Sequence, residues 1–388
     1  MEPSKDGNNM KITQLEILPA PFQGRAYIYV KLHTDEGIIG IGEASCSGKE
    51  GALVGALRDL ENTLIGEDPF QVEKLWQMIY RNAFWRGGPV LIGALSGIEH
   101  ALWDIKGKAL NVPVYELIGG MYRHKMKVYC WIGGGIPESW AEAAVQRIEA
   151  GWGGLKFTPF DPTGPAFSLA HGKKVEAIVK AVREAVGDEV PIAIDGHGRL
   201  NPVNAMEMAK RIEPYGILFF EEAVLPESVD AMATLRRNAG VPIATGERLY
   251  TRYPFREYLV KGAVDVVQPD ICTCGGIMEA FKIAAMADAF FATIAPHNPL
   301  SPLSTVICLH LDTVVPNFLI QEVPNGNNPE RKNLIVGFEE KPVNGHLEVP
   351  QGPGWGVSLN EDYIRSLSGD PSRGKWDAFD VDGSILDL

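Results

Sequence analysis

The sequence predicts a TIM-type (β/α) barrel preceded by a smaller α+β capping domain. From about residue 125 onward, short β-rich runs alternate with segments that place apolar residues at helical spacing. Acidic residues close several of these runs at a regular interval, as equivalent strands of a barrel would place them. The runs cover residues 127–132, 154–160, 191–195, 217–221, 242–246, 264–269, 291–295 and 318–321.

A doubly wound open sheet is the alternative to the barrel. That fold predicts a glycine-rich phosphate-binding turn after its first strand. Gly133, Gly134 and Gly135 follow the first run, but no G-x-G-x-x-G pattern continues from them. The barrel is therefore expected over residues 126–330. Asn201 followed by Pro202 predicts the start of one of its helices, because asparagine caps a helix and proline suits the first turn.

The segments on either side of the barrel predict a cap built from both ends of the chain. Residues 10–48 alternate apolar and polar side chains, which favours strands, and residues 52–118 show helical spacing. We expect residues 1–125 to form this α+β capping domain. The segment 331–388 is rich in proline and glycine and adds no further strand–helix repeat, so we expect it to return to the capping domain.

The composition is ordinary for a globular protein. Its 36 basic and 49 acidic residues give a formal net charge of −13, which argues against nucleic acid and anionic membranes as partners. No apolar stretch is long enough for a bilayer span, and residues 1–9 lack the apolar core of a signal peptide. The five cysteines are irregularly spaced, as expected for thiols in a reducing compartment, so we predict a cytoplasmic location.

Three carboxylates occupy corresponding positions in three consecutive runs. Asp195 closes the third run, Glu221 the fourth and Glu247 the fifth, with 26 residues from each to the next. The carboxyl ends of barrel strands face the active site. Any one of these acids alone could be a solvated loop residue, but three at one point repel each other unless a cation lies between them. Hard oxygen ligands in this number suit Mg²⁺, so the sequence predicts a magnesium site.

The next runs carry a candidate general base. Asp270 closes the sixth run and His297 the seventh, so we expect them on neighbouring strands. A carboxylate beside an imidazole fixes its tautomer and raises its basicity. A lone histidine after an apolar run is more often a packed core residue, but the matching aspartate favours a dyad. Glu322 follows the eighth run, and Glu222 should face away from Glu221 and pair with a basic residue behind the barrel.

Together these residues resemble the active site of the enolase superfamily, and the chain is similar to its mandelate racemase subgroup over nearly its whole length. The resemblance implies that Asp195, Glu221 and Glu247 bind Mg²⁺. It also implies that Asp270 and His297 form the dyad, and that Glu322 hydrogen-bonds the substrate carboxylate. In this family the metal binds that carboxylate, a base removes the α-proton, and the metal stabilises the enediolate. Relatives are often homo-oligomers, so we expect one here.

Two departures from the family pattern narrow the reaction. A racemase needs a second base, usually the last residue of a Lys-x-Lys pair on the second strand, and here Lys156 is followed by Thr158. Cycloisomerases and dipeptide epimerases use a lysine three residues after the aspartate of the sixth strand, and here that residue is Thr273. One strong base, His297, is therefore left.

The stretch from Asp195 to Arg199 resembles galactonate and gluconate dehydratases, in which the histidine equivalent to His197 is a general acid. The resemblance implies that a sugar (aldonic) acid substrate is dehydrated to a 2-keto-3-deoxy acid, with His197 protonating the departing 3-hydroxyl. Lys156 could contact the substrate or be held by a barrel carboxylate. Two alternatives stay open: a racemase or epimerase of a hydroxy acid with Lys156 as second base, and a non-catalytic metal-binding barrel.

Overall fold

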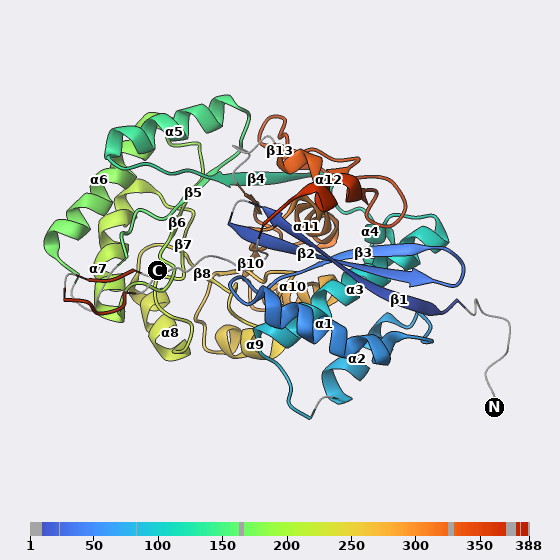
Figure 1. Ribbon diagram of the computed structural model, residues 1–388. Coiled ribbons are helices and arrows are strands. Elements are labelled where there is room, and N and C mark those ends of the chain that lie inside the picture. Colours follow the sequence, from blue (N-terminus) through green and yellow to red (C-terminus); the bar gives the residue numbers. More distant parts are fainter. Residues whose placement is uncertain are drawn as a thin grey trace.

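The N-terminal part of the chain forms an antiparallel sheet covered by helices. A computed structural model of the protein describes residues 10–22, 24–82, 84–162, 167–324, 330–369, 378–380 and 382–386. The strands β1 (Ile12–Phe22), β2 (Arg25–Thr34) and β3 (Ile39–Ala44) pair in the order β1-β2-β3. The helices α1 (Glu50–Leu64), α2 (Val72–Asn82), α3 (Pro89–Leu110) and α4 (Val114–Ile118) follow, and Figure 1 shows the sheet and helices beside the barrel.

Glycines let β3 approach α3 more closely than other residues would. A Cβ at Gly42 would lie 2.1 Å from the carbonyl oxygen of Gly97, and a Cβ at Gly40 would lie 2.1 Å from that of Ala101. Any side chain at these positions would force the strand and the helix apart, because real Cβ atoms do not approach a carbonyl so closely. The sheet is therefore seated directly on the backbone of α3.

Eight parallel strands make the barrel within the described residues. They are β4 (Lys125–Trp131), β5 (Leu155–Phe157), β6 (Ile192–Asp195), β7 (Phe219–Glu221), β8 (Ile243–Thr245), β9 (Val266–Val267), β10 (Thr293–Ile294) and β11 (Gln321–Val323). Their order is β10-β9-β8-β7-β6-β5-β4-β11, and a parallel bridge between Ile294 and Phe318 joins the two ends. The predicted fold class is confirmed.

Helices alternate with these strands and surround them (Figure 1). They are α5 (Pro137–Glu149), α6 (Leu169–Val186), α7 (Pro202–Ile212), α8 (Val229–Asn238), α9 (Arg252–Val260), α10 (Ile277–Asp288) and α11 (Pro302–Val314), with one 3-10 turn at Glu213–Tyr215. The predicted start of α7 is confirmed, because the side chain of Asn201 accepts a hydrogen bond from the Asn204 N–H at 2.9 Å. Within the described residues, we find no helix that could cross a membrane.

The C-terminal segment closes on the N-terminal sheet and on the barrel. It contains a 3-10 turn (Arg331–Asn333), β12 (Ile335–Val336), β13 (His346–Glu348), β14 (Ser358–Leu359) and α12 (Glu361–Ser366). Strand β13 pairs with β4, and α12 contacts β1. Fully buried Trp355 donates its ring N–H to the carbonyl of Ile41 at 2.9 Å. Residues 1–9, 370–377 and 387–388 of the predicted cap lie outside the described residues, and the domain boundaries stay a prediction.

Candidate active site

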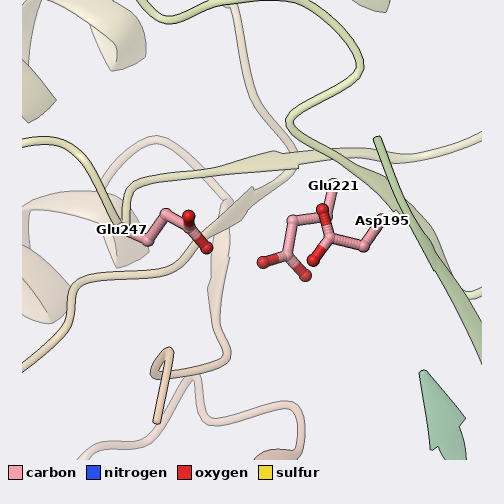
Figure 2. Close-up of side chains that lie close together, drawn as sticks. All are labelled: Asp195, Glu221 and Glu247. Atoms are coloured by element: carbon pink, nitrogen blue, oxygen red, sulfur yellow. The ribbon is translucent and has the colours of Figure 1, made fainter. Parts of the chain in front are cut away.

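Three carboxylates meet at the carboxyl ends of neighbouring barrel strands. Asp195 ends β6 and Glu221 ends β7, and the two are register partners. Glu247 follows β8. Each side chain offers an oxygen that lies within 4.8 Å of those of the other two, and Figure 2 shows Glu247 approaching the other two from the neighbouring strand. The spacing of 26 residues therefore predicted a real convergence of side chains.

The cluster has the electrostatics of a cation site. Asp195 is 1% exposed and Glu221 is 0% exposed. Burial, with added repulsion from Asp195, raises the pKa of Glu221 to about 8. Burial also raises the pKa of Glu247, against the opposing attraction of His297. A bound divalent cation would remove this cost by neutralising the carboxylates, so the all-oxygen donor set fits a hard metal ion.

Lys156 lies on β5 at the base of the same cluster and is fully enclosed. Its Nζ lies 3.0 Å from Glu221 Oε2, 3.3 Å from Asp195 Oδ2 and 2.7 Å from Glu322 Oε1. Burial opposes the charge of this lysine, but the attraction of the carboxylates outweighs it and raises the pKa of Lys156 well above its ordinary value. The side chain is therefore a fixed cation. Of the two roles that the sequence left open for Lys156, the contacts match the second, a lysine held by barrel carboxylates.

Replacing Lys156 by methionine should destabilise the metal-free protein by about 3–5 kcal/mol, because it leaves buried carboxylates without their counter-charge. Denaturant unfolding in excess chelator measures this loss. Added Mg²⁺ should restore more stability to the variant than to the parent protein, since the cation then replaces the missing ammonium. Equal unfolding free energies for the two proteins in chelator would contradict the assignment of Lys156 as the structural counter-ion.

Asp270 and His297 are brought together as predicted. They form an isolated parallel bridge beyond β9 and β10, and His297 Nδ1 lies 2.9 Å from Asp270 Oδ2. A carboxylate oxygen accepts, so Nδ1 is the donor in this contact and Nε2 is the nitrogen on the side of the carboxylate cluster. Nε2 lies 3.0 Å from Glu247 Oε2. Burial lowers the pKa of His297, but Glu247 and Asp270 outweigh it and raise that pKa to about 10.

His197 sits beside the first carboxylate of the cluster. Its backbone has φ of 48°, which turns the chain so that the His197 N–H bonds Asp195 Oδ1 at 2.9 Å. The ring Nε2 lies 3.0 Å from Asp195 Oδ2, while 39% of the side chain stays exposed. Attraction to Asp195 raises the pKa of His197 above its ordinary value. An imidazolium that is both paired and accessible can donate a proton.

Glu322 lies within β11, although the sequence placed it after the eighth run. Its Oε1 accepts from the ring N–H of Trp131, and its Oε2 accepts from the Asn298 N–H at 2.8 Å. Burial raises the pKa of Glu322, but Lys156 outweighs it and leaves the pKa lowered. The predicted hydrogen bond to a substrate carboxylate stays a prediction. The sequence analysis missed Trp131 and Asn298, although Trp131 lies in the first run, in phase with the barrel interior.

Glu222 does not belong to the group of three clustered carboxylates. Its Oε2 lies 2.5 Å from Arg248 Nη2, so the predicted pairing with a basic residue is confirmed. Thr273, at the place of the epimerase lysine, donates its hydroxyl to the Asp270 carbonyl at 3.4 Å. A threonine in that contact offers no base.

Comparisons with known proteins agree with this geometry. Residues 12–119 match the family model of the mandelate racemase/muconate lactonizing enzyme N-terminal domain. Residues 139–363 match the enolase C-terminal domain-like model. Together the two models cover both the sheet and helices of the cap and most of the barrel.

Two similar relatives are D-galactonate dehydratases. The one from Pectobacterium atrosepticum is 39% identical over 363 residues, covering 92% of this chain and 94% of the relative. The one from Verminephrobacter eiseniae is 38% identical over 366 residues, covering 93% and 95%.

Solved structures give the same result. A member of the enolase superfamily from Salmonella typhimurium superposes with a TM-score of 0.87 at 34% identity, covering 92% of this chain and 98% of that one. An enolase from Agrobacterium radiobacter, with bound Na and L-malate, superposes with a TM-score of 0.89 at 32% identity, covering 97% and 100%.

Proposed function

Because this chain belongs to the mandelate racemase/muconate lactonizing enzyme family, we propose that it is a Mg²⁺-dependent dehydratase of a sugar (aldonic) acid. The family predicted from the sequence is confirmed. The relatives named D-galactonate dehydratase support the reaction type. The observation that carries the proposal is that two imidazoles flank the carboxylate cluster, His197 beside Asp195 and His297 beside Glu247.

The carboxylates Asp195, Glu221 and Glu247 would hold the metal. When bound, Mg²⁺ would act as a Lewis acid on the substrate carboxylate and on the charge that develops there. The ammonium of Lys156 opposes protonation of Asp195 and Glu221 and holds their carboxylates in place.

The dyad performs the first proton transfer. His297 Nε2 accepts the α-proton of the substrate, because Asp270 holds the proton of Nδ1 and so leaves the second nitrogen as the acceptor. The electrons of the broken C–H bond enter the carboxylate to give an enediolate. The electron pair then expels the 3-hydroxyl.

His197 performs the second transfer. It donates a proton to the departing hydroxyl, which leaves as water, and the resulting enol tautomerises to the 2-keto-3-deoxy acid. The partial exposure of His197 supports this assignment, since the group must reach a substrate and later regain its proton. A panel of aldonic acids that includes D-galactonate, assayed for 2-keto-3-deoxy product, tests the reaction directly.

The contacts of Lys156 favour dehydration over racemisation. A second base must be free to reach the α-carbon. Lys156 is 2% exposed, and its ammonium is already shared among three carboxylates that hold it in place. We also propose that the protein is cytoplasmic, as its composition predicts, and that it forms a homo-oligomer, as the family resemblance predicts.

Replacing His197 by asparagine should separate the two steps. The variant keeps the metal ligands and His297, so it should still exchange the α-proton for deuterium without inverting configuration. Formation of 2-keto-3-deoxy acid should fall by about 10²–10⁴-fold, because the leaving hydroxyl lacks its acid. Proton NMR in heavy water measures exchange, and a keto-acid assay measures product.

Because His197 contacts the proposed metal ligand Asp195, the metal occupancy of His197→Asn has to be measured together with its activity. Normal occupancy together with dehydration at the parent rate would show that another group protonates the hydroxyl. Inversion of configuration by the parent protein, without any keto acid, would favour the racemase alternative.

A further inference from the structure

A buried glutamate of the cap holds the helix that follows Asp270. Glu99 lies on α3 and is 1% exposed. Its Oε2 accepts the Ile277 N–H at 2.9 Å and its Oε1 accepts the Met278 N–H at 3.0 Å, at the first turn of α10. Gly276 before this helix has no side chain to cap it, and a Cβ there would lie 2.2 Å from Glu99 Oε2. Glu99, from the capping domain, therefore accepts the N–H groups that a local N-cap side chain of α10 would otherwise accept.

The loop between Asp270 and α10 is held by further cap residues. The Gly275 N–H bonds Ser96 Oγ at 2.9 Å, and its carbonyl accepts the ring N–H of Trp76 at 2.8 Å. Ser45 donates its N–H to the carbonyl of Cys272 at 3.3 Å. Asp270 Oδ1 in turn accepts the Cys272 N–H at 2.8 Å. Hydrogen bonds from the cap thus hold the backbone of Cys272, the same residue whose N–H bonds the dyad carboxylate.

A second buried glutamate holds the helix that follows His297. Glu43 ends the apolar part of β3 and is 0% exposed. Its carboxylate accepts the N–H groups of Ser301 and Ser304, each at 3.2 Å, and the hydroxyl of Ser301. These residues form the first turn of α11. Figure 1 shows α3 and β3 beside these two helices, and the contacts of α3 with α10 and of β3 with α11 agree.

Both carboxylates occupy places that are costly for a charge. Burial raises the pKa of Glu43 to about 7 and that of Glu99 to about 8. In the described part of the chain neither carboxylate is within ion-pair distance of a basic side chain, although Arg331 and Lys282 act on them from farther away. The glycine contacts between β3 and α3 fix the two glutamates relative to each other.

We propose that Glu43 and Glu99 are positioning residues: the cap uses them to hold α10 and α11, and thereby sets the contact between Asp270 and His297. The inference rests on the proposed function, because it assigns the dyad as the proton acceptor. It makes the cap a part of the machinery for α-proton removal.

The test uses the full-length Glu99→Gln and Glu43→Gln variants. Glutamine keeps the size of the side chain but has one accepting oxygen, and its NH₂ group would face an N–H donor of the helix. A helix turn that loses one of its two N–H bonds can shift, and a misplacement of about 1 Å costs roughly 10²-fold in rate. We expect α-proton exchange and kcat to fall about 10–100-fold, with KM and Mg²⁺ affinity near the parent values.

Asp104→Asn is the matched control. Asp104 lies on the same helix α3, is also 0% exposed, and accepts two backbone N–H groups, from Ile41 and Trp355. Its backbone partners belong to β3 and the C-terminal segment, and its ion-pair partner Lys108 lies on α3 itself, so none of them belongs to the helices after the dyad. This variant should lose thermal stability comparably but keep kcat when assayed well below its melting temperature.

A spectroscopic signature tests the inference without any reaction. In protein labelled with ¹⁵N-histidine, the Nδ1–H proton of His297 bonded to Asp270 should give a downfield resonance, assigned by its loss in His297→Asn. It should shift or broaden in both glutamine variants and stay unchanged in Asp104→Asn. An unchanged resonance and unchanged exchange in the glutamine variants, or the same change in all three, overturns the inference. A parent protein that dehydrates no aldonic acid but whose resonance responds as expected would overturn the proposed function alone.

Discussion

His297→Asn is expected to lower α-proton exchange by at least about 10²–10⁴-fold, the usual contribution of a general base. The variant loses Nε2, the nitrogen that the bond between Nδ1 and Asp270 leaves free to accept the proton. Substrate and Mg²⁺ binding should change little, because the metal ligands stay in place. Deuterium uptake at the α-carbon, followed by NMR, measures the loss.

Asp270→Asn serves as the graded control. It keeps the imidazole but offers an amide to Nδ1, so its exchange rate should lie between those of the parent and of His297→Asn. If exchange in His297→Asn equalled that of the parent, the base would be another residue, with Lys156 the first to examine.

Removal of the metal should have an effect of similar size. Lewis-acid stabilisation is worth several kcal/mol, so turnover in excess chelator should fall by roughly 10³-fold or more and return when Mg²⁺ is added. Loss of a residue that hydrogen-bonds a metal ligand typically weakens metal affinity by roughly 10–100-fold. Glu221→Gln changes a proposed ligand itself, so it should weaken Mg²⁺ binding by more than that. Calorimetric titration measures the affinity.

Glu222→Gln is the control for that variant, since the adjacent Glu222 pairs with Arg248 and is not one of the three clustered carboxylates. Its Mg²⁺ affinity should match the parent value even if its stability falls. Full turnover in excess chelator would contradict the metal assignment.

The sequence predicted those features of the site that depend on strand order and side-chain alternation. Asp195 and Glu221 close equivalent apolar runs, and parallel strands bring such residues to the same edge. The contact of Asp270 with His297 follows from the same rule applied to the next two strands. Both inferences need only the repeat length and the period of two, which are visible in the chain.

Other features of the site depend on how deep a side chain lies in the barrel and on how the barrel closes. Neither leaves a local pattern in the sequence. The contacts of Lys156 require β5, β6, β7 and β11 to converge around one ammonium. The predicted eighth strand, residues 318–321, begins before the observed strand β11. Phe318 and Leu319 contact Ile294 of β10, whereas Gln321–Val323 pairs with β4. Glu322 consequently lies inside the strand. The turn at His197, with its positive φ, is likewise flanked by tertiary contacts, because the N–H groups of Gly196 and Gly198 bond the carbonyls of Glu221 and Glu222.

The position of Trp355 has a consequence for biosynthesis. Its ring N–H bonds Ile41 and its backbone N–H bonds Asp104, so a residue made late in translation completes the surroundings of strands made early. During vectorial synthesis the N-terminal sheet must wait, with part of its apolar face uncovered, until more than 300 further residues have left the ribosome. Nascent chains that stall before Trp355 should therefore depend on chaperones.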